Sequence, residues 1–329
     1  MNSFGQIFRV TIYGESHGSG VGIIVDGMPS GIKLTLDDFI DDINRRKPGA
    51  VGTTSRIEAD EVNILSGVFN DYTTGMPINL YFLNENTKSS DYSYIKNTPR
   101  PSHADFVASK KYNGFEDYRG GGHFSGRLTL PIVAAGVLAK KIISANITSE
   151  IVNIHGITDK NKFNDEVSLA ASSFDSVGGI IRITISNMPI GIGEPYFDSI
   201  ESVLAHLLYS VGGVKGVSFG IGFAGASLYG SEFNDCIIDA TGKTKTNNNG
   251  GINGGISNGN DIIINVFVKP TPSIYKSQRT YNFEKKEIDD LIIRGRHDAA
   301  IVLRAGVVLE AMCAIGLADL FLLSKKEGI

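Results

Sequence analysis

One sequence pattern occurs twice along this chain, in the same order. The stretch "VDGMPSGI" at 25–32 returns as "ISNMPIGI" at 185–192, and an amphipathic stretch follows each copy. Later, a Gly-Arg pair precedes an apolar segment that contains Ala-Gly-Val, first at 125–143 and again at 294–312. A repeated order of this kind predicts a single domain built from two similar halves, with approximate bounds 1–160 and 161–329.

Both amphipathic stretches have the spacing of helices that bury one face. Thr35 is placed to cap the first helix, whose expected apolar face holds Phe39, Ile40 and Ile43. The second helix is expected to bury a row of aliphatic side chains: Ile200, Val203, Leu204, Leu207 and Leu208.

The strand candidates do not alternate one for one with helices. They lie at 8–13, 21–27, 61–69, 77–83, 179–185, 216–223 and 261–268. A doubly wound parallel sheet needs regular alternation, so we predict an α+β fold in which antiparallel sheets pack on long apolar helices. The Gly/Asn-rich segment 244–261 is expected to form a loop. Whether this loop covers a ligand is left open.

The longest apolar run, 299–323, is expected to be a buried or interface helix. It contains Arg304, Glu310 and Asp319, and these charges argue against a membrane span. The N-terminal residues lack the apolar stretch of a signal peptide. We therefore predict no membrane partner.

Charge and cysteine content narrow the functional class further. The net charge is −4, which argues against a surface for nucleic acid. The two cysteines, Cys236 and Cys313, form neither a zinc ribbon nor a disulfide framework, which favours a reducing cytoplasm and no metal site.

The stretch "GESHG" at 14–18 fits the nucleophile elbow of serine hydrolases, G-x-S-x-G. That motif needs a helix directly after the serine. Here "SGVGIIVDGMP" follows and predicts a second strand, and only 13 residues precede the motif. We therefore interpret the stretch as a turn between strands that presents His17.

The stretch "GIGFAG" at 220–225 fits the dinucleotide fingerprint G-x-G-x-x-G. The residues after it show no helical period and leave little room for a βαβ unit. We interpret it as a glycine-rich strand or bulge.

Several Arg and His residues stand on glycine-rich loops: Arg45, Arg46, Arg100, His103, Arg119, His123, Arg127, Arg296 and His297. Glycine amides and forked guanidinium groups converge well on anions, so this pattern suits a phosphorylated small molecule that carries carboxylates. Ordinary roles are open too. These residues could form a solvated basic surface, and Asp298 could cap the helix that follows it.

Taken in order, these motifs resemble the chorismate synthase family over nearly the whole chain. The matching stretches are "FGQIFRVTIYGESHG", "VDGMPSGI", "RRKPG", "ILSGVF", "TTGMPI", "RPSHADF", "DYRGGG", "AAGVLAKK", "GIGEP", "GGISNG", "VKPTPS" and "GRHD". The resemblance implies the family fold, in which long helices are sandwiched between antiparallel β-sheets, and a homotetramer.

The resemblance also implies a reaction. The substrate 5-enolpyruvylshikimate 3-phosphate loses phosphate and a ring hydrogen in a 1,4-anti-elimination, which yields chorismate for aromatic amino acid biosynthesis. Such a lyase is a flavoprotein that needs reduced FMN although the net reaction is not redox. NADPH enters only as a source of reduced flavin.

Site residues follow from matching motif positions. The implied catalytic residues are His17, which protonates the departing phosphate, His103, which protonates reduced flavin, and Asp298, which relays the ring proton through flavin. The implied substrate-binding residues are Ser16, Arg46, Ser125, Arg127 and Arg296. The implied cofactor-binding residues are Arg46, His123, Phe124, Ser125, Gly212, Gly213, Gly254, Lys269, Pro270, Thr271, Pro272, Ser273 and Arg296.

Some positions depart from the family pattern. His123 replaces an arginine, Leu128 replaces a glutamate, and Ala299 replaces a proline. The segment after Gly49 also lacks a basic residue. The substituted arginine and glutamate leave a non-catalytic binding homologue open, and the stretch "GIGFAG" with the implied flavin site leaves a flavin- or nicotinamide-dependent oxidoreductase open.

The replacement at His123 predicts a pH effect. An imidazole in place of a fixed positive charge loses that charge between about pH 5 and 8. FMN affinity, measured by fluorescence titration, is therefore expected to fall as the pH rises through that range. An FMN affinity that stays flat across the range contradicts this electrostatic role.

Overall fold

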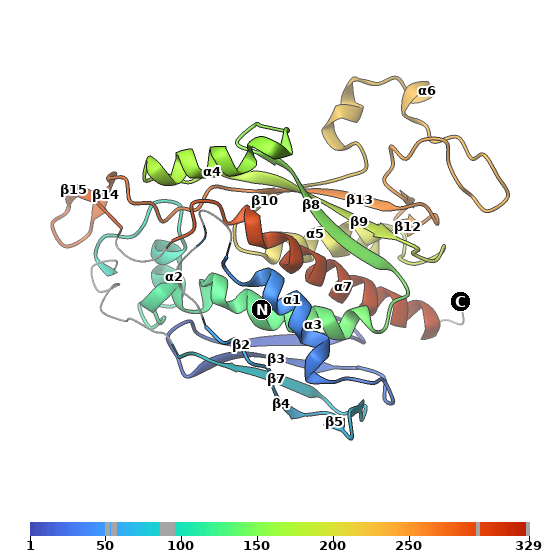
Figure 1. Ribbon diagram of the computed structural model, residues 1–329, viewed down its shortest axis with the longest axis horizontal. Helices are drawn as coiled ribbons and strands as arrows, with labels where there is room; N and C mark the ends of the chain where they lie inside the picture. The colour runs from blue at the N-terminus through green and yellow to red at the C-terminus, as the bar shows by residue number, and fades with distance from the viewer. Residues whose placement is uncertain (50–52, 54–57, 86–95, 294–296, 327–329) are drawn as a thin grey trace.

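The chain forms three layers, with a β-sheet on each outside and helices between them (Figure 1). The computed structural model describes residues 1–49, 53, 58–85, 96–293 and 297–326. The inner layer holds α1 (Ile40–Arg46), α3 (Thr129–Lys140), α5 (Ile200–Ser210) and α7 (Val302–Lys326). This is the α+β sandwich that the sequence predicts.

The first sheet is antiparallel and contains strands in the order β1-β2-β3-β7-β4. Its central strand buries Val21, Ile23 and Val25 against the helices, as strand alternation requires. The bounds are β1 (Ser3–Phe4), β2 (Arg9–Gly14), β3 (Gly20–Asp26), β7 (Ile78–Leu83) and β4 (Asn63–Ser66). A short hairpin adjoins β4: β5 (Val68–Phe69) and β6 (Tyr72–Thr73).

The second sheet is also antiparallel, in the order β10-β13-β9-β8. Ile183 of β9 faces Ile264 of β13 in register, and both side chains are fully buried. The bounds are β8 (Asn146–Ile154), β9 (Gly179–Ser186), β10 (Val214–Phe219) and β13 (Ile262–Val268).

The two sheets have the same topology once β1 is set aside. Each sheet then has four strands. Numbered by their order along the chain, they lie side by side as first, second, fourth and third. A helix follows the second strand (α1 or α5), and an apolar helix follows the fourth (α3 or α7). This arrangement parallels the sequence repeat. Because β8 belongs to the second sheet, the structural division lies before β8 rather than at residue 160.

Shorter elements border these layers. The helices are α2 (Asp105–Lys111), α4 (Phe163–Ser172) and α6 (Gly230–Phe233), and the hairpins are β11 (Ile252–Asn253) with β12 (Ile256–Ser257) and β14 (Gln278–Asn282) with β15 (Glu287–Leu291). The 3-10 turns are η1 (Leu36–Phe39), η3 (Arg119–Phe124), η4 (Gly126–Leu128), η5 (Lys160–Lys162), η6 (Tyr196–Asp198) and η7 (Gly222–Ser227).

Helix α7 lies at the centre and packs closely on its neighbours. A Cβ built on Gly136 of α3 would lie 2.4 Å from Cβ of Ala311 in α7, so glycine is what allows this approach. A Cβ on Gly316 would lie 2.8 Å from the Leu207 side chain of α5. Small residues therefore bring α3 and α7 nearly into backbone contact and leave room for α5 side chains against α7.

The buried charges of α7 are satisfied within the fold. Glu310 is fully buried and accepts hydrogen bonds of 2.6 and 2.8 Å from Arg45. Asp319 accepts the backbone N–H groups of Gln6, Ile7 and Phe8 at 2.7–2.9 Å. By length and composition α7 could cross a membrane, but most of it is buried inside this fold. The prediction of a buried helix is confirmed.

Some local expectations need correction. Ile40 does not face the core, because 49% of it is exposed, whereas Phe39 and Ile43 are buried. Residues 220–223 do not extend a strand, since the chain turns into η7 after β10 ends. The sequence predicted no strand at β8, and the predicted loop 244–261 contains the β11–β12 hairpin.

The contact between α3 and α7 gives a stability prediction. Gly136→Ala places a methyl group against Ala311 and is expected to lower the free energy of unfolding by about 1–3 kcal/mol. Gly230→Ala is the matched control, since a Cβ there meets no atom within 4 Å. Urea unfolding curves measure both variants. Equal stability of Gly136→Ala and wild type would show that the helices are not in close contact.

Candidate active site

His17 lies in the turn between β2 and β3. The order strand, turn, strand excludes the nucleophile elbow, as expected. Ser16 is fully buried, and its N–H donates to the carbonyl of Gly122 at 3.1 Å. The Ser16 hydroxyl lies 3.2 Å from Nδ1 of His17, whose exposed fraction is 8%. The turn is thus tied to the glycine segment that follows α2.

Three successive glycines fill the space between the two histidines of interest. Gly120, Gly121 and Gly122 have φ values of +58°, +82° and +53°, which L side chains rarely adopt. A Cβ on Gly120 would lie 2.2 Å from Cε1 of His17. A Cβ on Gly121 would lie 3.3 Å from Cε1 of His103. The structure therefore brings His17 and His103 to the same backbone turn.

His103 is held by a carboxylate from its own motif. Its Nδ1 lies 2.6 Å from Oδ1 of Asp105, which fixes the proton on Nδ1 and leaves Nε2 without one. Arg100 donates hydrogen bonds to the same carboxylate from Nε at 2.7 Å and from Nη2 at 2.8 Å. These bonds hold the pKa of Asp105 well below its usual range despite burial. Burial lowers the pKa of His103 below 6.5 although Asp105 opposes this, so the imidazole is neutral at pH 7.

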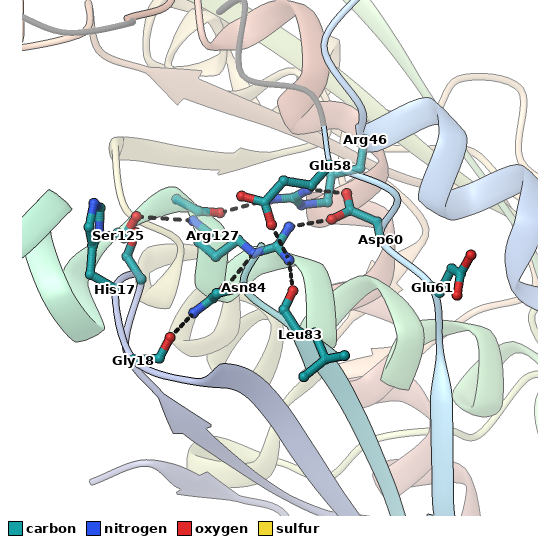
Figure 2. Close-up of polar contacts among 12 residues, drawn as sticks. His17, Gly18, Arg46, Glu58, Asp60, Glu61, Leu83, Asn84, Ser125 and Arg127 are labelled. Carbon is teal, nitrogen blue, oxygen red and sulfur yellow. Dashed lines mark hydrogen bonds and ion pairs between the residues drawn. The ribbon is translucent and has the colours of Figure 1, made fainter. Parts of the chain in front are cut away.

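Arg127 is buried among acceptors from its own chain (Figure 2). Its Nε donates to Asn84 at 3.1 Å, and Nη2 donates to the Leu83 carbonyl at 2.9 Å. Glu58 lies 2.8 Å from Nη2, and Nη1 bonds to Asp60. Two carboxylates thus neutralise the cationic group.

Arg46 shares one of these carboxylates. Its Nη1 lies 3.4 Å from Asp60, and its Nε and Nη2 donate to Thr129 and to the Gly126 carbonyl at 3.0 and 3.2 Å. Burial and the positive charge of Arg304 lower the pKa of Arg46 to about 9, so it stays cationic at neutral pH. In Figure 2, His17 and Ser125 lie on the opposite side of Arg127 from Asp60.

Asp298 lies beside the arginine cluster. Its carboxylate accepts a 2.5 Å hydrogen bond from Arg304, whose charge acts on Arg46. Asp298 is buried and lies four residues before Val302, the first residue of α7, so it does not cap that helix. Arg296 lies outside the described residues.

The segment Lys269–Ser273, expected to contact flavin, lies beside the His103 loop. Ser273 accepts a hydrogen bond from Arg100 at 3.1 Å, and the Lys269 ammonium donates to the Ser102 carbonyl at 2.7 Å. The Lys269 N–H donates to the carbonyl of Gly213 at 2.9 Å, which brings the Gly212–Gly213 turn to the same place.

Cavities lie beside His123, Phe124 and Ser125. One of about 320 Å³ is lined by all three and by Gly212. Another, of about 200 Å³, is lined by Phe124 together with His103. His123 is anchored through Nδ1, which donates to the Gly14 carbonyl at 2.8 Å. Four of the expected flavin residues, His123, Phe124, Ser125 and Gly212, therefore line these cavities, whereas Lys269–Ser273 contacts the His103 loop.

Gly254 is separated from the others. It lies in the β11–β12 hairpin, where the carbonyl of Gly255 accepts the N–H of Ile200 at the start of α5. Gly212 and Gly213 follow the opposite end of that helix. Within one chain, the structure does not bring Gly254 to the candidate site.

Two arginines of the basic clusters have other roles. Arg119 pairs with Asp117 at 2.8 Å, and its side chain is 41% exposed. Arg45 pairs with Glu310 of α7. Neither converges on the space between the histidines.

Three carboxylates at the site did not emerge from the sequence analysis. Asp105 follows His103 by two residues, and a carboxylate so close in the same motif is a usable signal. Glu58 and Asp60 stand in "EADE", an acidic stretch typical of a solvated surface. Their burial depends on contacts far along the chain, which no local pattern indicates.

The comparisons with known proteins identify the family. The family model described as chorismate synthase matches residues 8–322. The chain belongs to the chorismate synthase family. A chorismate synthase of Chitinophaga pinensis is 53% identical over 100% of this chain and 98% of its own length. One of Pyrococcus abyssi is 44% identical over 96% of each chain.

A solved structure supports the same family and the fold. It is titled as a crystal structure of chorismate synthase, and it covers 98% of this chain and 93% of its own. The sequence identity is 26% and the TM-score is 0.75. The predicted family, fold class and lyase class are confirmed, and nothing in these similarities supports the oxidoreductase or the non-catalytic homologue.

The His103–Asp105 pair gives a pH prediction. Asp105 raises the pKa of His103 against burial, so Asp105→Asn is expected to lower the titration midpoint of His103. NMR titration of the imidazole proton measures this midpoint. Asp165→Asn, an exposed charge on α4, is the control. A midpoint that is unchanged or higher in Asp105→Asn would contradict the assigned contact.

Proposed function

We propose that this chain converts 5-enolpyruvylshikimate 3-phosphate to chorismate by 1,4-anti-elimination of phosphate, with reduced FMN as its cofactor. The observation that supports this most is the glycine turn that His17 and His103 both border. The buried cations Arg46 and Arg127 lie with His17 in Figure 2, and the segment expected to bind flavin contacts the His103 loop. An anionic substrate and a flavin can therefore lie side by side.

On the substrate side, cations and an imidazole have separate tasks. The guanidinium groups of Arg46 and Arg127 are the proposed partners of the phosphate and carboxylate groups, for which forked donors are suited, and the substrate would take the place of Glu58 or Asp60 beside them. His17 gives a proton to the departing phosphate, a general-acid role typical of imidazole. Ser16 and Ser125 line this part of the site, and Ser16 is no nucleophile.

The residues present fit the proposed cofactor. The Thr271 hydroxyl oxygen is buried without a hydrogen-bond partner among the described residues, and it stands in the segment expected to contact flavin. Lys269 to Ser273, the Gly212–Gly213 turn, His123, Phe124 and Ser125 would hold the group. When bound, reduced FMN supplies electron density transiently as phosphate leaves.

On the cofactor side, the chain supplies two proton-handling groups. Asp105 keeps the proton of His103 on Nδ1, so Nε2 can accept and return a proton. Asp298 is the proposed acceptor of the ring proton, and Arg304 holds its carboxylate in place. Both groups are largely shielded from water, which limits proton loss to solvent.

The wider setting is part of the proposal. We place the enzyme in the cytoplasm, in aromatic amino acid biosynthesis, and expect a homotetramer. Gly254 would then reach a flavin from a neighbouring subunit. NADPH serves at most to reduce the flavin.

An anaerobic assay tests the function directly. Substrate and chemically reduced FMN are supplied, and phosphate, chorismate and remaining reductant are followed. Elimination predicts equal amounts of phosphate and chorismate without net loss of reductant. Net consumption of reductant would support an oxidoreductase instead, and substrate binding without turnover would support a binding homologue.

Variants test the roles in the same assay. His17→Ala is expected to reduce kcat by about 10²- to 10⁴-fold, the usual contribution of a general acid. Asp298→Ala tests the second proton position in the same way. His155→Ala, an exposed imidazole paired with Glu166, is the control and should keep wild-type activity. Full activity of His17→Ala would remove His17 from the mechanism.

A further inference from the structure

His297 is a histidine whose hydrogen-bonding groups have no partner. Both ring nitrogens are buried, and neither has a hydrogen-bond partner among the described residues. A neutral imidazole has one donor and one acceptor, and leaving both unmet away from water is unfavourable. Such a group calls for an explanation, and a bound ligand is one.

The other histidines make the contrast clear. All six histidines lie in the described part of the chain. Four of them place Nδ1 against a protein oxygen: His17, His103, His123 and His155. The fifth, His206, is exposed and packs against the Phe4 ring. Four of the other five histidines thus have a hydrogen-bond partner within the described residues, whereas His297, with both ring nitrogens buried, has none there.

The surroundings of His297 belong to the cofactor side of the site. Its ring packs against Tyr275 at 5.4 Å between centroids, and Tyr275 follows the segment Lys269–Ser273 by two residues. Arg100, which donates to Ser273, also acts electrostatically on His297. His297 therefore lies where the flavin segment and the His103 loop meet.

The ring is uncharged at neutral pH. Burial, followed by the charge of Arg100, lowers the pKa of His297 to about 4. An uncharged imidazole is a poor partner for a phosphate or a carboxylate, which prefers a cation. It suits a neutral polar edge that presents acceptors and a donor, such as the carbonyl and N–H groups of an isoalloxazine ring.

We propose that His297 is a cofactor-contacting residue whose unpartnered ring nitrogens hydrogen-bond the polar edge of the bound flavin. This inference rests on the proposed function, since it takes FMN as the ligand. It assigns a contact to the histidine of "GRHD", beside the expected contact of Arg296. His297 is not a structural histidine in this account.

The test combines two measurements on His297→Phe. Without FMN, the unfolding midpoint is expected to stay unchanged or rise, because a phenyl ring has no polar atom to leave unmet. Titration with oxidised FMN is expected to show affinity weakened roughly 10-fold. His155→Phe, the exposed control, should bind FMN like wild type. His297→Asn and His297→Gln place an amide near Nδ1 and Nε2 respectively, and recovery by either identifies the bonding nitrogen.

Clear outcomes overturn the proposal. Wild-type FMN affinity in His297→Phe would show that the ring nitrogens make no flavin contact. A large drop in the unfolding midpoint of this variant without FMN would assign His297 a structural role. If the wild-type chain itself binds no FMN, the proposed cofactor fails along with this contact, whereas FMN binding unaffected by the substitution removes only the contact.

Discussion

The arrangement of the site depends on one steric constraint, the absence of side chains at Gly120 and Gly121. These residues take positive φ values and leave room for an imidazole at each. Any Cβ at Gly120 would collide with His17. Two histidines from separate segments can therefore approach one turn, which is a prerequisite for a substrate and a cofactor to react between them.

The three-layer fold supplies the segments that meet at this turn. His17 comes from the turn between β2 and β3, Arg46 from α1, Arg127 from η4, and Asp298 from the segment before α7. Close packing of α3 on α7 through Gly136 fixes these segments relative to one another. The buried carboxylates Glu58 and Asp60 neutralise the arginines, so cationic side chains can stay inside a protein without a bound anion.

Sequence patterns were sufficient for the features that depend on local chemistry. The α5 face, the turn at His17 and the buried helix follow from periodicity and strand order. Strand β8 was missed because three consecutive polar residues, Thr148, Ser149 and Glu150, interrupt its apolar alternation. The pairing of Arg127 with Glu58 was not predictable, because 69 residues separate them and only the folded chain joins them.

The central claim is that one space, bounded by His17, His103 and Asp298, holds both substrate and flavin. A crystal structure with FMN and 5-enolpyruvylshikimate 3-phosphate bound tests it most directly. The account predicts the phosphate beside His17, Arg46 and Arg127, with the flavin between the substrate and His103. Ligands bound at any distance from this glycine turn, or on separate surfaces, would contradict it.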